Sequence, residues 1–321
     1  MQGVPVGVFT FSLLGRLEAR GNGPALELHG RKARELLCFL LLSRDRPQPR
    51  EALAEMLWGD APGGQSRKYL RQAVWQLQTA LEAAAPGVGG TLLHAEQEWI
   101  QIRRSDSDVW LDVAELDSAY ASLPSLPHGS WDEDTAHQLE DAVKLYRGDL
   151  LEGWYVDWCV FERERYRTIY LTILERLISH CETMHRWEEG IQHALLALQR
   201  EPAHERTHRR LMRLLYLSGD RTAALRQYDR CAASLRSELG VEPGEATRAL
   251  HEDVRADRIP RLEERPLTIA SGTVARDDPN ALRRKPSVLR SLHEVRKALD
   301  HARSVVERDI ASLERQSRPL S

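Results

Sequence analysis

A repeat of 34 residues in the second half of the chain most constrains its fold. Trp187-Glu-Glu-Gly-Ile aligns with Arg221-Thr-Ala-Ala-Leu, and the same offset places Gly190 on Ala224. Small side chains at equivalent positions let neighbouring helices approach closely. A period of this length predicts tandem helical units that bury a continuous core between them.

The spacing resembles the tetratricopeptide arrangement, in which two antiparallel helices form each unit. Pro202 follows the first repeat where its second helix should end. Because only two repeats are clear and such a stack usually needs about three units, further helices must complete it. We expect them at Trp131 to Arg147 and at Trp158 to Leu177.

The first hundred residues follow a different order. β-branched and aromatic residues predict a small antiparallel sheet at Val6–Glu18 and Leu26–His29. Apolar spacing then predicts three helices, at 31–42, 50–58 and 66–82. A β-hairpin is expected after them, formed by Thr91–His94 and Trp99–Arg103. This order is typical of a winged helix-turn-helix, whose third helix enters the major groove of DNA.

We therefore expect a mainly α-helical chain in four segments. They are a winged helix-turn-helix with a small sheet and a wing at 1–105, a tetratricopeptide-like domain at 106–260, a linker at 261–286 and a C-terminal helix at 287–316. Heptad spacing predicts the last helix through Leu292, Val295, Leu299, Ala302, Val306 and Leu313. Dimerisation and packing on the repeats both fit this heptad.

The composition excludes several classes of protein. No run approaches the ~18 apolar residues that a membrane span needs. The four cysteines, Cys38, Cys159, Cys181 and Cys231, form no CxxC pair, which predicts neither a zinc site nor a disulfide framework and favours the cytoplasm. A net charge of -3 points away from nucleic acid, but residues 1–81 carry 11 basic and 7 acidic side chains. A basic surface is therefore expected near the N-terminus.

The helix predicted at 66–82 is the best candidate for contact with DNA. Its apolar stripe comprises Leu70, Val74, Leu77 and Leu81, and no carboxylate lies between Ser66 and Leu81. The opposite face presents Arg67, Lys68, Arg71, Gln72, Trp75 and Gln78. Arg and Gln pair with guanine and adenine edges, and Lys or Arg neutralises phosphates. A basic helix in isolation is more often only a solvated face, and its third place in the winged-helix order reverses that preference.

The hairpin is a weaker candidate for contact with DNA. Glu96 and Glu98 at its tip would be repelled by phosphate, which leaves Arg103 and Arg104 as the expected backbone contacts.

No motif supports catalysis, a cofactor or a metal. The chain contains no GxxxxGK[ST], GxGxxG or GxSxG, and the pair His204 and His208 has no evident third ligand. An aromatic group comprises Trp154, Tyr155, Trp158, Phe161 and Tyr166. Aromatic residues at helical spacing are more often core than a ligand pocket, and both interpretations stay open.

Several motifs in order resemble a known family over roughly residues 5–260. Leu57-Trp-Gly-Asp with the helix after it resembles the DNA-binding half of the Streptomyces antibiotic regulatory protein family. Four later stretches resemble the other half of such proteins, the bacterial transcriptional activator domain. They are Leu145-Tyr-Arg-Gly-Asp-Leu-Leu, Phe161-Glu-Arg-Glu-Arg-Tyr, Glu201-Pro-Ala-His-Glu-Arg and Ser237-Glu-Leu-Gly-Val-Glu-Pro.

The resemblance implies a transcriptional activator that binds repeated elements of promoter DNA, often as a homodimer, and recruits RNA polymerase through sigma factor. It assigns the DNA-facing role to the six residues of the 66–82 helix named above. Two other functions are weighed against it. One is a scaffold whose repeats bind protein without sequence-specific DNA binding, and the other is a sensor that binds a ligand at the aromatic group.

Overall fold

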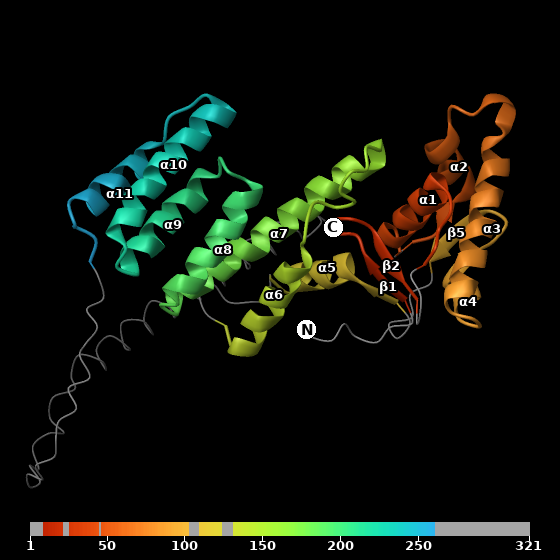
Figure 1. The fold of residues 1–321 in the computed structure, drawn as a ribbon, viewed down its shortest axis with the longest axis horizontal. Coiled ribbons are helices and arrows are strands. Elements are labelled where there is room, and N and C mark those ends of the chain that lie inside the picture. Colours follow the sequence, from red (N-terminus) through yellow and green to blue (C-terminus); the bar gives the residue numbers. More distant parts are fainter. Residues whose placement is uncertain (1–8, 22–25, 45, 103–108, 124–130, 261–321) are drawn as a thin grey trace, which may run out of the picture. The chain divides into compact units, whose positions relative to one another are not determined.

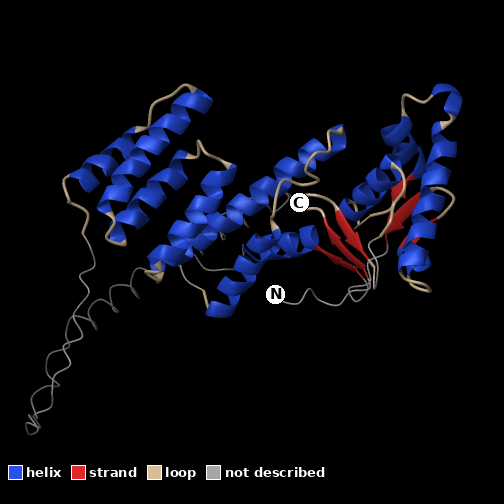
Figure 2. Cartoon of the chain, in the orientation of Figure 1, coloured by secondary structure: helices blue, strands red, loops and turns tan. Residues whose placement is uncertain are grey.

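Two small sheets and a series of helices make up the described part of the chain (Figures 1 and 2). This computed structural model describes residues 9–21, 26–44, 46–102, 109–123 and 131–260. These residues fall in one compact unit, Met1–Arg261. The predicted linker at 261–286 and the predicted C-terminal helix at 287–316 lie outside the described residues.

The N-terminal part has the predicted order of sheet, three helices and hairpin. Its elements are β1 (Phe9–Ser12), β2 (Glu18–Arg20), α1 (Arg31–Leu42), β3 (Gln48–Pro49), α2 (Arg50–Trp58), a 3-10 turn (Pro62–Gly64), α3 (Ser66–Ala84), α4 (Gly89–Leu92), β4 (Leu93–Ala95) and β5 (Trp99–Ile102). β1 pairs antiparallel with β2, and β5 lies between β3 and β4, antiparallel to both. The apolar stripe of α3 is buried, as predicted.

Two expected strands differ from the structure. Leu26–His29 forms no strand in the described structure, and Leu26 meets the sheet through a hydrogen bond from its backbone N to Ala19 O (3.0 Å). The strand predicted to begin at Thr91 begins at Leu93, because α4 continues to Leu92.

A third strand of the first sheet lies far along the chain, in a stretch that we expected to be helical. β6 (Val109–Leu111) pairs parallel with β1, with Phe9 opposite Val109 and Phe11 opposite Leu111. Local periodicity does not reveal such a strand, because its pairing partner lies about a hundred residues earlier. The segment that leads into the helical domain therefore completes the N-terminal sheet.

The helical domain confirms the repeat. Its helices are α5 (Asp112–Ser122), α6 (Glu133–Leu145), α7 (Asp157–Thr183), α8 (Trp187–Arg200), α9 (Glu205–Leu217), α10 (Arg221–Leu239) and α11 (Glu245–Arg255). α8 and α10 begin 34 residues apart, and α7 to α11 pack in chain order (Figure 1). A Cβ at Gly190 would lie 3.2 Å from Cys181 Cβ and from the methyl groups of Leu214. The small residue is therefore needed for this close helix approach.

A buried carboxylate ties α5 to the first sheet. Asp112 accepts hydrogen bonds from the backbone N–H groups of Leu13 (2.8 and 2.9 Å), Leu14 (2.8 Å) and Val113 (2.8 Å). Burial raises its pKa to about 6, although these hydrogen bonds act in the opposite direction.

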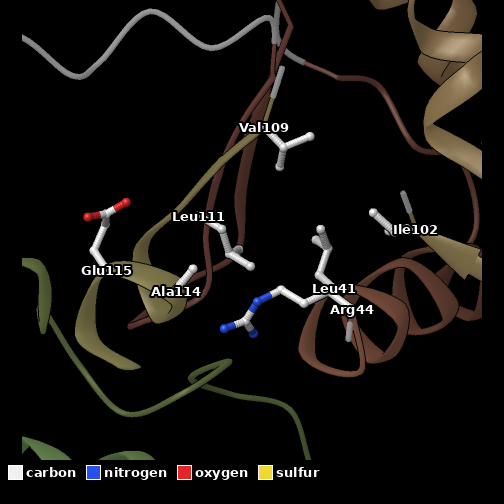
Figure 3. A pocket seen from close by; sticks show the side chains of 7 residues that line it. All are labelled: Leu41, Arg44, Ile102, Val109, Leu111, Ala114 and Glu115. Carbon is white, nitrogen blue, oxygen red and sulfur yellow. The ribbon is translucent and has the colours of Figure 1, made fainter. Parts of the chain in front are cut away.

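A second carboxylate joins three elements. Asp117 of α5 accepts a hydrogen bond from Nη2 of Arg44 (2.8 Å), a residue that follows α1. It also accepts from Nη2 of Arg165 (2.6 Å) and from the hydroxyl of Tyr166 (3.0 Å), both on α7. Arg44 is 8 % exposed and lies beside Leu41, and both line a cavity of about 20 Å³ (Figure 3). The N-terminal and helical parts therefore share polar contacts as well as one hydrophobic core.

Candidate nucleic-acid interface

The surface of α3 opposite its buried stripe is open to solvent. Lys68, Arg71 and Gln72 are exposed, Trp75 is 65 % exposed, and Gln78 is half-buried. Within the described ranges, neither Lys68 nor Arg71 has a carboxylate within ion-pair distance. Both cations are therefore available to an anionic partner.

Arg67 differs from the other cations of α3. Its guanidinium is paired with the carboxylate of Glu51 in the first turn of α2, and both side chains are more than 70 % exposed. Solvent weakens such a pair, so it is readily exchanged for another anion. The structure therefore gives Arg67 a competing partner that the sequence pattern of α3 alone does not reveal.

Arg50 is a cation of this surface that sequence reasoning missed. It opens α2, and its Nε donates to Glu96 O (2.6 Å) in the turn between β4 and β5, while its backbone N donates to Glu98 O (2.9 Å). Partial burial and then the positive charge of Arg71 lower the pKa of Arg50. The two guanidinium groups are therefore close enough to repel each other, and an anion between them would relieve that repulsion.

The signal for Arg50 in the sequence was weak. The residue follows Pro49 at the start of a predicted helix, but the carbonyl groups that hold it lie 46 and 48 residues later. Only the fold brings the hairpin and the start of α2 together, through the pairing of β3 with β5.

The predicted hairpin is formed, although its first strand begins two residues later than expected. β4 and β5 pair with Leu93 opposite Ile102, and the rings of His94 and Trp99 stack with centroids 5.3 Å apart. Arg103 and Arg104, the expected backbone contacts, lie outside the described residues.

The aromatic group does not converge on one site. Tyr166 is fully buried, and Trp158 packs edge-on against Phe39 of α1 with centroids 5.4 Å apart. Tyr155 and Phe161 are instead 90 % and 83 % exposed. The core interpretation therefore holds for part of the group, and the exposed members need a separate explanation.

His204 and His208 serve the helix packing. His208 Nε2 bonds Pro202 O (2.7 Å), and its Nδ1 accepts from Gln227 Nε2 (2.7 Å). His204 Nδ1 bonds Thr207 Oγ1 (2.7 Å). Among the described residues, no three histidine, cysteine or carboxylate side chains gather as metal ligands would. None of the described helices has the length and hydropathy of a membrane-spanning segment.

Comparisons with known proteins agree with this architecture. The family model of the bacterial transcriptional activator domain matches residues 111–255. The transcriptional regulatory protein EmbR of Mycobacterium tuberculosis is 26 % identical over 292 residues, 89 % of this chain and 73 % of that protein. The regulatory protein DnrI of Streptomyces peucetius is 28 % identical over 255 residues, 77 % of this chain and 92 % of that protein.

A solved structure shares the fold. Mycobacterium tuberculosis EmbR, in complex with a low-affinity phosphopeptide, superimposes with a TM-score of 0.55 at 22 % sequence identity. The match covers 79 % of this chain and 67 % of that one.

Proposed function

Because the chain belongs to the Streptomyces antibiotic regulatory protein family of transcriptional activators, we propose that it binds repeated elements of promoter DNA through α3 and recruits RNA polymerase through sigma factor. In this proposal α3 enters the major groove, and the β4–β5 hairpin lies beside the adjacent backbone. The single observation that carries the proposal is the exposed face of α3, with unpaired cations and no carboxylate of its own between Ser66 and Leu81.

The residues of this face divide by chemistry. Arg71 and Gln72 are suited to guanine and adenine edges, and Trp75 offers an apolar surface to a thymine methyl group. Lys68 and Arg50 are suited to phosphates, and so is Arg67 once it leaves Glu51. Gln78 lies further along the same face and would read the groove only if α3 lies deep in it. Arg103 and Arg104 remain proposed backbone contacts.

A mobility shift with the promoter of the chain's own operon tests the proposal. We expect the labelled promoter to be retarded and to resist competition by unrelated DNA of equal length. Because phosphate neutralisation supplies much of the affinity, the logarithm of the binding constant should fall linearly with log salt, with a slope of about -0.9 per phosphate contacted.

The scaffold alternative makes the opposite prediction. A protein that only docks other proteins would show no preference for the promoter over competitor DNA, at any salt concentration. Equal competition by both DNAs would therefore contradict the proposed function.

A further inference from the structure

A cavity of about 360 Å³ opens between the N-terminal part and the segment that leads into α7. Five apolar side chains line it, from Leu17, Ala19, Leu26, Leu28 and Trp154. Leu26 is buried, and the other four are half-buried against the hydrophobic core, with part of their surface left to the cavity. Small-molecule sites have this form, with volumes of about 300–1,000 Å³ and mostly apolar walls.

The polar part of the lining is mostly cationic. Arg16, in the turn between β1 and β2, and Arg34 of α1 both line the cavity, and Glu152 is the one carboxylate with direct access to it beside them. Across the described residues, no carboxylate lies within ion-pair distance of Arg16 or Arg34, and no hydrogen bond occupies either guanidinium. We call this cavity the arginine pocket, and its positive charge is left for a ligand.

Hydrogen bonds hold the walls of the arginine pocket in place. The backbone N of Leu26 donates to Ala19 O (3.0 Å), which joins two parts of the apolar wall. The backbone N of Glu152 donates to Gly15 O (2.8 Å), and the carbonyl of Trp154 accepts from an arginine side chain of α7 (2.9 Å). A ligand would therefore enter a preformed site, and little of its binding free energy would be spent on ordering the walls.

The lining distinguishes between classes of ligand. Inorganic phosphate would use the guanidinium groups and leave the apolar wall uncovered. A neutral apolar molecule would cover the wall and bring the two cations no partner. A carboxylate on an apolar body suits both parts, because a guanidinium binds a carboxylate through two parallel hydrogen bonds. Its single negative charge also equals the excess of the two arginines over Glu152.

We propose that the arginine pocket binds a small organic acid, with its carboxylate at Arg16 and Arg34 and its apolar body against Trp154 and the leucines. Such a ligand would contact the N-terminal part and the segment before α7 at once, so it would stabilise the junction between them. The inference goes beyond the proposed function and does not depend on it, because no residue of α3 lines this pocket.

Calorimetric titration of the full chain without DNA tests the proposal. The probes are phenylacetate, cinnamate and hexanoate, each compared with its neutral primary amide. We expect at least one carboxylate to bind at one site per chain and about tenfold more tightly than its amide, because hydrogen bonds between two charged groups are the stronger ones. If none of the three carboxylates binds more tightly than its amide, the proposal is wrong.

A charge variant assigns the binding to the two arginines. Arg16→Gln/Arg34→Gln should lower the affinity for the carboxylate about tenfold and leave that for the amide within about twofold. Arg31→Gln/Arg46→Gln removes two exposed cations that do not line the pocket, and it should bind both probes like the wild type. Equal carboxylate affinity in the wild type and in Arg16→Gln/Arg34→Gln would overturn the proposal.

A filling variant tests the position of the ligand. Ala19→Leu adds apolar volume to the wall without changing a charge, so it should weaken carboxylate and amide alike, by about tenfold. Thermal unfolding of the ligand-free variant shows whether the fold is kept. A folded Ala19→Leu variant with wild-type affinity for the carboxylate would place the ligand elsewhere and contradict the proposal.

A mobility shift separates this site from the DNA-facing surface. Arg16→Gln/Arg34→Gln should retard the promoter with a midpoint within about twofold of the wild type. Weaker retardation together with unchanged carboxylate affinity would assign the two arginines to DNA and overturn the proposal. If the wild-type chain fails to retard the promoter at all, the proposed DNA function fails, and the calorimetric result still decides the arginine pocket.

Discussion

Two groups of arginines in this chain use the same charge in opposite ways. Arg44 and Arg165 direct their guanidinium groups at Asp117, which joins the end of α1 to α5 and α7. Arg50 and Arg71 lie close enough to repel each other, and among the residues described no carboxylate pairs with either. The first pair is neutralised by a carboxylate of the protein itself, and the second leaves its charge for a partner.

The difference shows that the number of arginines is a poor guide to DNA binding. What decides the role of each is the nearest carboxylate and the degree of burial. Arg67 falls between the two groups, because Glu51 pairs with it on an exposed surface where the pair is weak. Substitutions that separate stability from DNA affinity should test this division.

The largest effect should come from Arg44, the buried arginine of the first pair. Arg44→Ala leaves the carboxylate of Asp117 with Arg165 and Tyr166 alone, and breaking a buried ion pair on one side costs about 3 kcal/mol or more. Urea denaturation should therefore show a free energy of unfolding lower by about that amount. Arg46→Ala, an exposed neighbour, should change it by less than about 0.5 kcal/mol. Equal losses in both variants would remove the distinction.

Asp112 extends the comparison to a carboxylate held by backbone amides. Its pKa in the folded protein is about 6, against about 3.9 in an unfolded chain. Between these values the folded protein binds a proton that the unfolded chain does not. Its contribution to the free energy of unfolding should thus rise by about 2–3 kcal/mol as the pH falls from 7 to 4.

The reference for this measurement is Asp112→Asn, which cannot titrate at this position. The difference in free energy of unfolding between wild type and variant should follow the predicted pH dependence. A difference that is constant from pH 4 to pH 7 would show that the carboxylate titrates normally.

Arg71→Ala should affect DNA affinity and leave stability unchanged. We expect promoter binding to weaken by about 1–3 kcal/mol and the salt slope to shrink if the side chain also meets phosphate. Fluorescence anisotropy across a salt series measures both. Arg213→Ala removes the same charge from an exposed position on α9 and should bind DNA like the wild type. An unchanged footprint for Arg71→Ala would contradict the assignment of α3.

The smallest effect should come from the intermediate arginine. Glu51→Gln frees Arg67 from its ion pair, so promoter affinity should rise about two- to fivefold, in line with the small energy of exposed pairs. Glu55→Gln makes the same charge change on α2 and serves as control. Weaker binding in Glu51→Gln would mean that the pair positions Arg67 for DNA.

Much of the helical fold could be predicted because the information is local. The apolar spacing predicted α1 at 31–42 and α2 at 50–58 with the observed bounds, and the predicted 34-residue offset equals the distance between the starts of α8 and α10. β6 could not be predicted in this way. It has three residues, and the strand that stabilises it lies near the other end of the described N-terminal part.

In the candidate site, too, local features could be predicted from the sequence and contacts between distant elements could not. The composition of one helix was enough to identify the exposed face of α3, since its buried and exposed residues alternate at helical spacing. Arg50 and the partner of Arg67 depend on contacts between elements, so no local pattern signals them. The exposure of Tyr155 and Phe161 likewise follows from which face of α7 packs against α1.

The pairing of β1 with β6 also imposes an order on biosynthesis. Phe9 leaves the ribosome about 100 residues before Val109, its partner in the sheet. At translation rates of about 5–20 residues per second, β1 waits roughly 5–20 s for that partner. During that interval the nascent N-terminal part has an open sheet edge, so its first sheet can be completed only after β6 has been made.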